Sequence, residues 1–250
     1  MKEFMMKKIP RRKFITGIGH KLGVLIGLSV LVNQIMIPGT RAQTIMADNL
    51  DTNPVNVGAN NLHNAASSQG ADRNKFNQRI LIVYASQFGS TREIAERVSN
   101  RLVAKGNHIV LMHVDQVESL DGYDAAIIGG AIQYDKWMGS ARHFVKKFQP
   151  QLESMPVACF FGCLTLSRHD EASLAQAQGY AEKISALFSQ SKPVSVQGFA
   201  GVLDYRKMSI PVRIVAKLIL SIIGVKEGDY RDWPAIDNWT DVVAVALSDK

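Results

Sequence analysis

A short turn rich in hydroxyl groups lies between an apolar run and a helix-forming stretch, and its residue types suit the binding of a phosphate. The apolar run at 80–84 reads ILIVY, and good helix formers follow from Arg92 onward. Backbone N–H groups at a helix N-terminus and the positive end of the helix dipole attract anions. Hydroxyl side chains add donors, and a glycine allows close approach of the backbone. The turn contains Ser86, Gln87, Phe88, Gly89, Ser90 and Thr91.

The composition of this turn narrows the kind of phosphate that it suits. No lysine lies in it, so the pattern G-x-x-x-x-G-K-[ST] of nucleoside triphosphatases is absent, and so is the dinucleotide pattern G-x-G-x-x-G. A terminal monophosphate therefore fits better than a pyrophosphate or a triphosphate. The alternative is an ordinary strand-to-helix turn in which a serine or threonine caps the helix.

The elements that must position this turn alternate between strands and helices along the chain. Apolar runs predict strands over 80–85, 108–114, 125–130, 156–162 and 194–199. Helical patterns are expected over 91–105, 139–148, 171–189, 209–223 and 237–247. Such alternation is typical of an α/β fold with a parallel sheet. We expect a doubly wound five-stranded sheet of order 2-1-3-4-5, with the ligand at the carboxyl ends of the strands.

The turn resembles the phosphate loop of the flavodoxin family, which reads roughly [ST]-x-x-G-x-T after the first strand. Ser86, Gly89 and Thr91 fill those places. The resemblance implies that residues 86–91 hold the phosphate of FMN. It also implies that the loop after the third strand lies against the flavin ring, with Tyr134 or Trp137 as a stacking partner. We favour Tyr134, and we expect Trp137 to pack on the following helix. The ring loop comprises Gly130, Ala131, Ile132, Gln133 and Tyr134.

Residues near the end of the fourth strand offer little further chemistry. Cys159 and Cys163 are the only cysteines, and a spacing of four along a strand places their Cα atoms about 13 Å apart, beyond disulfide reach. We expect two buried thiols, no metal site and a solvated His169. The loop at 162–170 has few of the acidic and aromatic residues that flavodoxins place there.

The C-terminal third is similar to flavodoxin-fold menaquinone-dependent protoporphyrinogen oxidases. This similarity rests on the pattern GxLxYxx from Gly201, a basic-apolar helix and the segment DYRDW at 229–233. The sequences TREIA at 91–95 and FVKK at 144–147 also match. The resemblance implies oxidation of protoporphyrinogen IX by an FMN enzyme with a quinone acceptor; no catalytic acid or base is identified. The alternatives are an exported electron-transfer flavodoxin with a redox protein partner, and a binding module that lost FMN.

The predicted helix around 210–223 is apolar on most positions, with Arg213 and Lys217 four residues apart. Such a helix suits a membrane surface close to a quinone pool. The alternative is a core helix that covers the sheet and keeps its basic residues in water.

The first 42 residues resemble a twin-arginine export signal, with Arg11-Arg12-Lys13 before an apolar stretch from Leu22 to Ile37. We expect cleavage near Ala42 or Ala47, or else retention as an anchor, and a location in the periplasm or on the outer face of the membrane. Residues 43–78 are interpreted as a flexible polar linker and 79–250 as one flavodoxin-like domain.

The charge distribution supports treating the first segment separately. Of the 29 basic and 22 acidic residues, eight and one lie in the first 42, which leaves 21 of each in the rest. The basic character therefore belongs to the leading segment, and we expect no binding of nucleic acid.

Overall fold

The computed structural model describes residues 55–57, 77–207, 210, 213, 214, 216, 217 and 226–249. The chain divides into two units, one of residues 1–49 and 208–224 and the other of residues 50–207 and 225–250. The architecture below is that of the second unit. The leader expected over 1–42 lies outside the described residues, as does most of the helix expected over 209–223.

The five predicted strands form a parallel sheet in the predicted order. They are β2 (Arg79–Ala85), β3 (His108–His113), β4 (Ala125–Gln133), β6 (Val157–Cys163) and β7 (Ser195–Ala200). The spatial order is β3-β2-β4-β6-β7, which is 2-1-3-4-5 in the numbering of the parallel strands, so the predicted doubly wound fold is confirmed. The register pairs Ile80 with Ile109 and Ala125, which aligns the carboxyl ends of the central strands.

Two further strands extend this sheet. β1 (Val55–Val57) pairs antiparallel with β3 at its outer edge, and it lies within the range interpreted as a linker. β5 (Lys136–Trp137) pairs antiparallel with the end of β4. A separate pair, β8 (Val202–Leu203) and β9 (Gly228–Asp229), follows β7.

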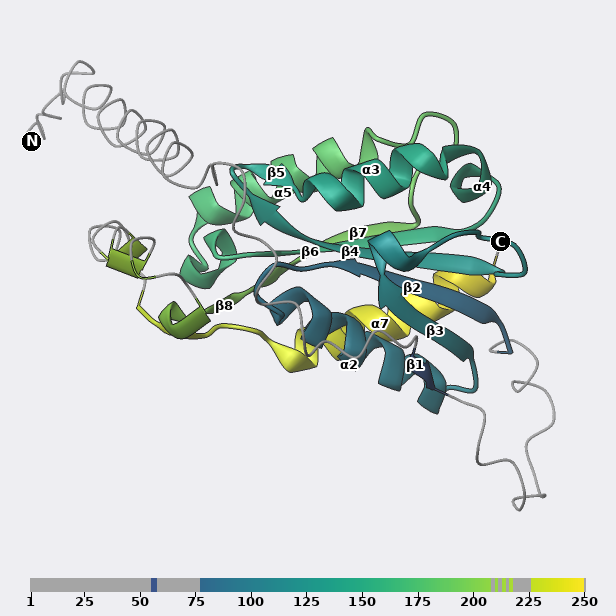
Figure 1. The fold of residues 1–250 in the computed structure, drawn as a ribbon, viewed down its shortest axis with the longest axis horizontal. Coiled ribbons are helices and arrows are strands. Elements are labelled where there is room, and N and C mark those ends of the chain that lie inside the picture. The colour runs from purple at the N-terminus through teal and green to yellow at the C-terminus, as the bar shows by residue number, and fades with distance from the viewer. Residues whose placement is uncertain are drawn as a thin grey trace, which may run out of the picture. The chain divides into compact units, whose positions relative to one another are not determined.

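Helices cover both faces of the sheet (Figure 1). α2 (Ser90–Ala104) and α7 (Trp233–Ser248) lie on one face, and α3 (Gly139–Lys147), α4 (Gln149–Glu153) and α5 (Glu171–Ser185) lie on the other. Short 3-10 helices occur at Val114–Gln116, Thr165–Arg168 and Tyr205–Lys207. No helix of the described residues is both long and apolar enough to span a membrane.

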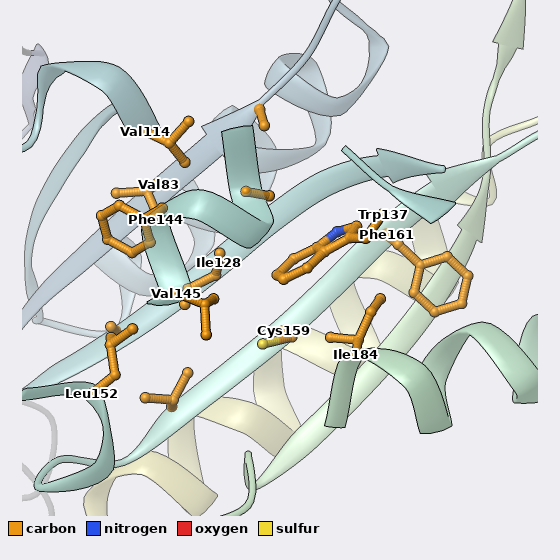
Figure 2. Packing of buried hydrophobic residues seen from close by; sticks show 14 of the residues in the cluster. Val83, Val114, Ile128, Trp137, Phe144, Val145, Leu152, Cys159, Phe161 and Ile184 are labelled. Atoms are coloured by element: carbon orange, nitrogen blue, oxygen red, sulfur yellow. The ribbon is translucent and has the colours of Figure 1, made fainter. Parts of the chain in front are cut away.

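The strands supply both cores because their side chains alternate between the two faces. Ile80 and Ile82 of β2 pack in the cluster under α2 and α7, while Leu81 and Val83 pack in the cluster under α3, α4 and α5. Figure 2 shows the second cluster, in which Trp137, Phe144 and other apolar side chains meet above the sheet. This double burial explains why the strands read as continuous apolar runs.

Ion pairs join the two helices on the first face. Arg97 of α2 binds Asp237 of α7 at 2.7 Å, and Arg101 binds Asp241 at 2.5 Å. Lys105 reaches the same Asp241 at 3.0 Å. These contacts hold α7 along α2, the helix that follows the phosphate turn.

Candidate flavin site

Hydrogen bonds among its own residues hold the turn between β2 and α2, and no side chain caps the start of α2. Gly89 adopts a φ of 89°, a left-handed conformation that glycine accepts without strain. Its N–H donates to the Ser86 hydroxyl at 3.0 Å, and its carbonyl accepts the Glu93 N–H at 3.0 Å. No side chain caps α2, so the first N–H groups of the helix keep no side-chain acceptor. An anion bound at the carboxyl edge of the sheet would accept hydrogen bonds from these N–H groups.

Thr91 carries the most specific sign of a ligand in this turn. The residue is fully buried, and its hydroxyl Oγ1 has no hydrogen-bond partner in the structure. A buried hydroxyl without a partner costs about 1–3 kcal/mol. Oγ1 lies close to Gly162 near the end of β6, where an added Cβ would be 3.4 Å from it. A phosphate oxygen at this edge would accept the unused hydrogen bond, so the residues present fit the phosphate of FMN.

An arginine far along the chain keeps the start of α2 suitable for an anion. Glu93 lies in the first turn of the helix, where a free carboxylate would repel a phosphate. Its carboxylate accepts a hydrogen bond from Nη1 of Arg231 at 2.5 Å, and Nη2 of the same arginine binds Asp229 at 2.6 Å. Arg231 is not among the site residues predicted from the sequence. Its only signal in the sequence is its place in the segment DYRDW at 229–233.

The predicted ring loop is a β-hairpin rather than an irregular loop, which corrects the expected end of the strand at residue 130. Gly130, Ala131, Ile132 and Gln133 belong to β4, where Ala131 pairs with Gly162 and Ile132 with Trp137. Tyr134 and Asp135 form the two-residue turn, with φ of 51° and 57°. Positive φ at both central positions is typical of the type I′ turn, one of the two turn types that two-residue hairpins favour.

The two glycines before the hairpin make room for aromatic rings of this chain. A Cβ on Gly129 would lie 2.1 Å from the ring of Phe160, and a Cβ on Gly130 would lie 2.4 Å from Nε1 of Trp137. Trp137 is 3% exposed and lies in the same buried cluster as Ala141 and Phe144 of α3, the following helix on which it was expected to pack. Tyr134 is 42% exposed at the hairpin tip and remains the aromatic side chain of this loop available to a flavin.

Hydrogen bonds connect the hairpin to the phosphate turn and to α5. Nε2 of Gln133 donates to Oε1 of Gln87 at 2.5 Å, so the structure brings the two predicted loops together. The Tyr180 hydroxyl of α5 donates to the Asp135 carboxylate at 2.5 Å, and Gln176 donates to the same carboxylate at 3.2 Å. Burial, and then the Asp135 carboxylate, raise the pKa of Tyr180. The conformation of Tyr134 is thus set by its neighbours on both sides.

β6 contains Cys159 and Cys163, and the loop after it contains His169. Cys159 and Cys163 are both buried and unbridged, as predicted, and burial raises the pKa of each thiol. His169 is exposed, with a φ of 53°. Within the described ranges, no cluster of three or more His, Cys, Asp or Glu side chains is placed to hold a metal ion.

A doubly wound sheet with an anion-binding turn after its first parallel strand and a hairpin beside it defines a flavodoxin-like protein. The model of the Flavodoxin domain family matches residues 81–229, and the chain belongs to this family. FMN is the cofactor of the domain, and the turn at 86–91 and the hairpin at 130–134 are suited to hold it.

Known proteins similar to the chain include two oxidoreductases and a flavodoxin. Protoporphyrinogen IX dehydrogenase [quinone] of Escherichia coli (strain K12) is 31% identical over 179 residues, which cover 69% of this chain and 97% of that protein. The apo form of an NADH:FMN oxidoreductase (EmoB) aligns with a TM-score of 0.45 at 13% identity, over 70% of this chain and 92% of that one. The two-electron reduced flavodoxin of Megasphaera elsdenii aligns with a TM-score of 0.41 at 12% identity, over 68% and 99%.

Proposed function

We propose that this flavodoxin-family oxidoreductase oxidises protoporphyrinogen IX and passes the electrons to a quinone. The observation that carries the proposal is the 31% identity to a protoporphyrinogen IX dehydrogenase [quinone] over 97% of its length. The match extends over nearly the whole relative and over 69% of this chain. It is therefore more specific than the fold alone.

The roles of the chain in this reaction are binding and orientation. FMN supplies the redox chemistry when bound. The open start of α2 and the Thr91 hydroxyl would bind its phosphate, and the hairpin would set the position of the ring through Tyr134. The Gln133–Gln87 hydrogen bond ties these two parts at a fixed spacing. This fixed spacing favours one placement of the flavin.

The test is an anaerobic assay of the FMN-loaded full chain with protoporphyrinogen IX and a menaquinone analogue. Porphyrin fluorescence measures the product. We expect porphyrin to form only when the quinone is present. The variant Thr91→Val should lose activity at limiting FMN and recover it at high FMN. A loaded protein that forms no porphyrin, yet exchanges electrons with a cytochrome or ferredoxin, would replace this function by the electron-transfer one.

The proposed location is outside the cytoplasmic membrane, and it rests on the paired Arg11 and Arg12 before an apolar stretch. Fractionation of cells that express the full chain, compared with a variant carrying lysine at both positions, tests it. Cytoplasmic retention of the wild type would overturn it.

Membrane-surface contact through residues 210–223 is a second proposal, based on the apolar composition of this segment and its basic Arg213 and Lys217. Co-flotation of the protein with anionic liposomes, weakened in Arg213→Gln/Lys217→Gln, would support it. No co-flotation would remove it.

A further inference from the structure

A pocket of about 350 Å³ lies beneath the β4–β5 hairpin, between the hairpin, α3 and α5. Its inner surface is apolar. Trp137 and Ile184 are buried at 3% and 2% exposure, and Ile132 and Leu187 are half-buried around them. Figure 2 shows Trp137 from the hairpin and Ile184 from α5 within the same packed layer. The volume is at the small end of ligand-binding pockets, so a compact ligand fits it.

Three cationic side chains line the same pocket from its exposed side. Lys136 of β5, Arg142 of α3 and Lys183 of α5 are all exposed residues. Nε of Arg142 donates to the Trp137 carbonyl at 3.0 Å, which fixes the guanidinium beside the pocket. Nζ of Lys183 lies 5.9 Å from the centre of the Tyr180 ring. An apolar interior with a cationic rim is therefore built from three separate elements.

The three cationic side chains of this rim have no carboxylate partner within the described part of the chain. No carboxylate there forms an ion pair with Lys136, Arg142 or Lys183. The acid of the pocket, Asp135, already accepts hydrogen bonds from Tyr180 and Gln176. By contrast, a carboxylate partner is present for each arginine of the following group: Arg92, Arg97, Arg101, Arg168, Arg206 and Arg231.

We propose that this pocket binds a compact hydrophobic carboxylate, with its apolar body against Trp137 and Ile184 and its carboxylate between Arg142 and Lys183. The apolar interior disfavours inorganic phosphate and sugars, whose polar groups would lose their hydrogen bonds to water. The positive rim disfavours cations, and arginine is suited to bind a carboxylate. This site is separate from the phosphate turn and goes beyond the proposed function.

Two sources share this chemistry, a fatty acid and the propionate arm of a tetrapyrrole. Calorimetric titration with decanoate tests whether the pocket binds a hydrophobic carboxylate. The titration uses the full chain, both loaded with FMN and free of it. We expect one molar equivalent to bind, and the variants Arg142→Gln and Lys183→Gln each to weaken binding roughly tenfold through loss of a charge-assisted hydrogen bond. Decanol should bind more weakly and respond to neither variant.

Two control variants separate this site from general charge effects and from the flavin. Lys146→Gln removes an exposed cation of α3 that does not line the pocket, and it should leave the decanoate affinity unchanged. Thr91→Val should also leave it unchanged, so the outcome does not depend on FMN. Absence of decanoate binding, or equal weakening by Lys146→Gln, would overturn the proposal.

A competition step distinguishes the two sources. Displacement of decanoate by protoporphyrin IX, but not by its dimethyl ester, would assign the pocket to a propionate arm and tie it to the proposed substrate. Failure of both porphyrins to displace decanoate would assign the pocket to a fatty acid. Either result supports the carboxylate site, because both require the same rim.

Discussion

Replacement of Thr91 by valine should move two properties of the protein in opposite directions. Valine keeps the shape of threonine and removes only the hydroxyl, which is fully buried and has no partner in the structure. Without FMN, this hydroxyl lowers the free energy of unfolding, because it loses its hydrogen bonds to water on folding and gains none in return. With FMN bound, it is expected to hydrogen-bond the phosphate.

The magnitudes follow from these two environments. A buried polar group without a partner costs about 1–3 kcal/mol, so the free energy of unfolding of the FMN-free variant should rise by up to that amount. A hydrogen bond to a charged group contributes about 1.5–3 kcal/mol, so the Kd for FMN should rise roughly 10- to 150-fold.

Two measurements on one preparation test this prediction. Urea denaturation of the FMN-free protein gives the stability, and quenching of flavin fluorescence during titration gives the Kd. Ser99→Ala is the matched control, because Ser99 lies on the same helix, is 1% exposed and also has a hydroxyl without a partner. It should leave the Kd unchanged. An unaltered Kd in Thr91→Val would refute the assignment of this hydroxyl to the phosphate.

Three further predictions concern the framework around the site. Gly129→Ala should lower the free energy of unfolding by about 1–3 kcal/mol, because its Cβ would lie 2.1 Å from a phenyl ring. Gly179→Ala, which meets nothing within 4 Å in α5, should raise it by about 0.5–1 kcal/mol; urea denaturation compares the pair, and equal effects would contradict the packing. Tyr180→Phe should cost about 1.5 kcal/mol by losing its hydrogen bond to Asp135. It should also reduce the loss of stability above about pH 10, where the unfolded tyrosine ionises and the folded one, with its raised pKa, does not; an unchanged alkaline profile in thermal melts would count against this. Hydrogen bonds and charges from Arg101 of α2 and from Lys105, which follows that helix, lower the pKa of Asp241 to about 2, so its contribution to stability is present above about pH 4 and lost as the pH falls toward 2. Asp241→Asn should flatten this acid loss by less than about 1 kcal/mol, because a third of the side chain is exposed; a steeper loss in acid urea titrations would refute it.

The sheet and the phosphate turn could be predicted because their signals are local. A strand buried on both faces must be apolar throughout, and β2 shows this directly in its sequence. The turn combines hydroxyls with a glycine whose φ of 89° few other residues accept. Both features depend on residue type over a few positions, which is what a sequence displays.

The hairpin and the pocket could not be predicted because their determinants are distant or unusual. Tyr134 and Asp135 occupy positive φ without the Asn-Gly pair that marks such turns. The Asp135 carboxylate accepts a hydrogen bond from Tyr180, 45 residues further along the chain.

The expected start of α7, residue 237, lies four residues after the observed start at Trp233. The local signals for the earlier start are present, because Asp232 caps the helix by accepting from the Ala235 N–H and a proline lies in its first turn.

The pairing of β1 with β3 has a consequence for how molecules of this protein meet one another. Without β1, β3 would be the edge strand of the sheet, with a row of unsatisfied backbone groups that a strand from a second molecule could join. Val55–Val57 occupy part of that row, from Ile109 to Leu111. A shortened chain that begins at residue 79 would offer this edge to its neighbours. Pairing of Val55–Val57 with β3 therefore limits self-association through this edge of the sheet.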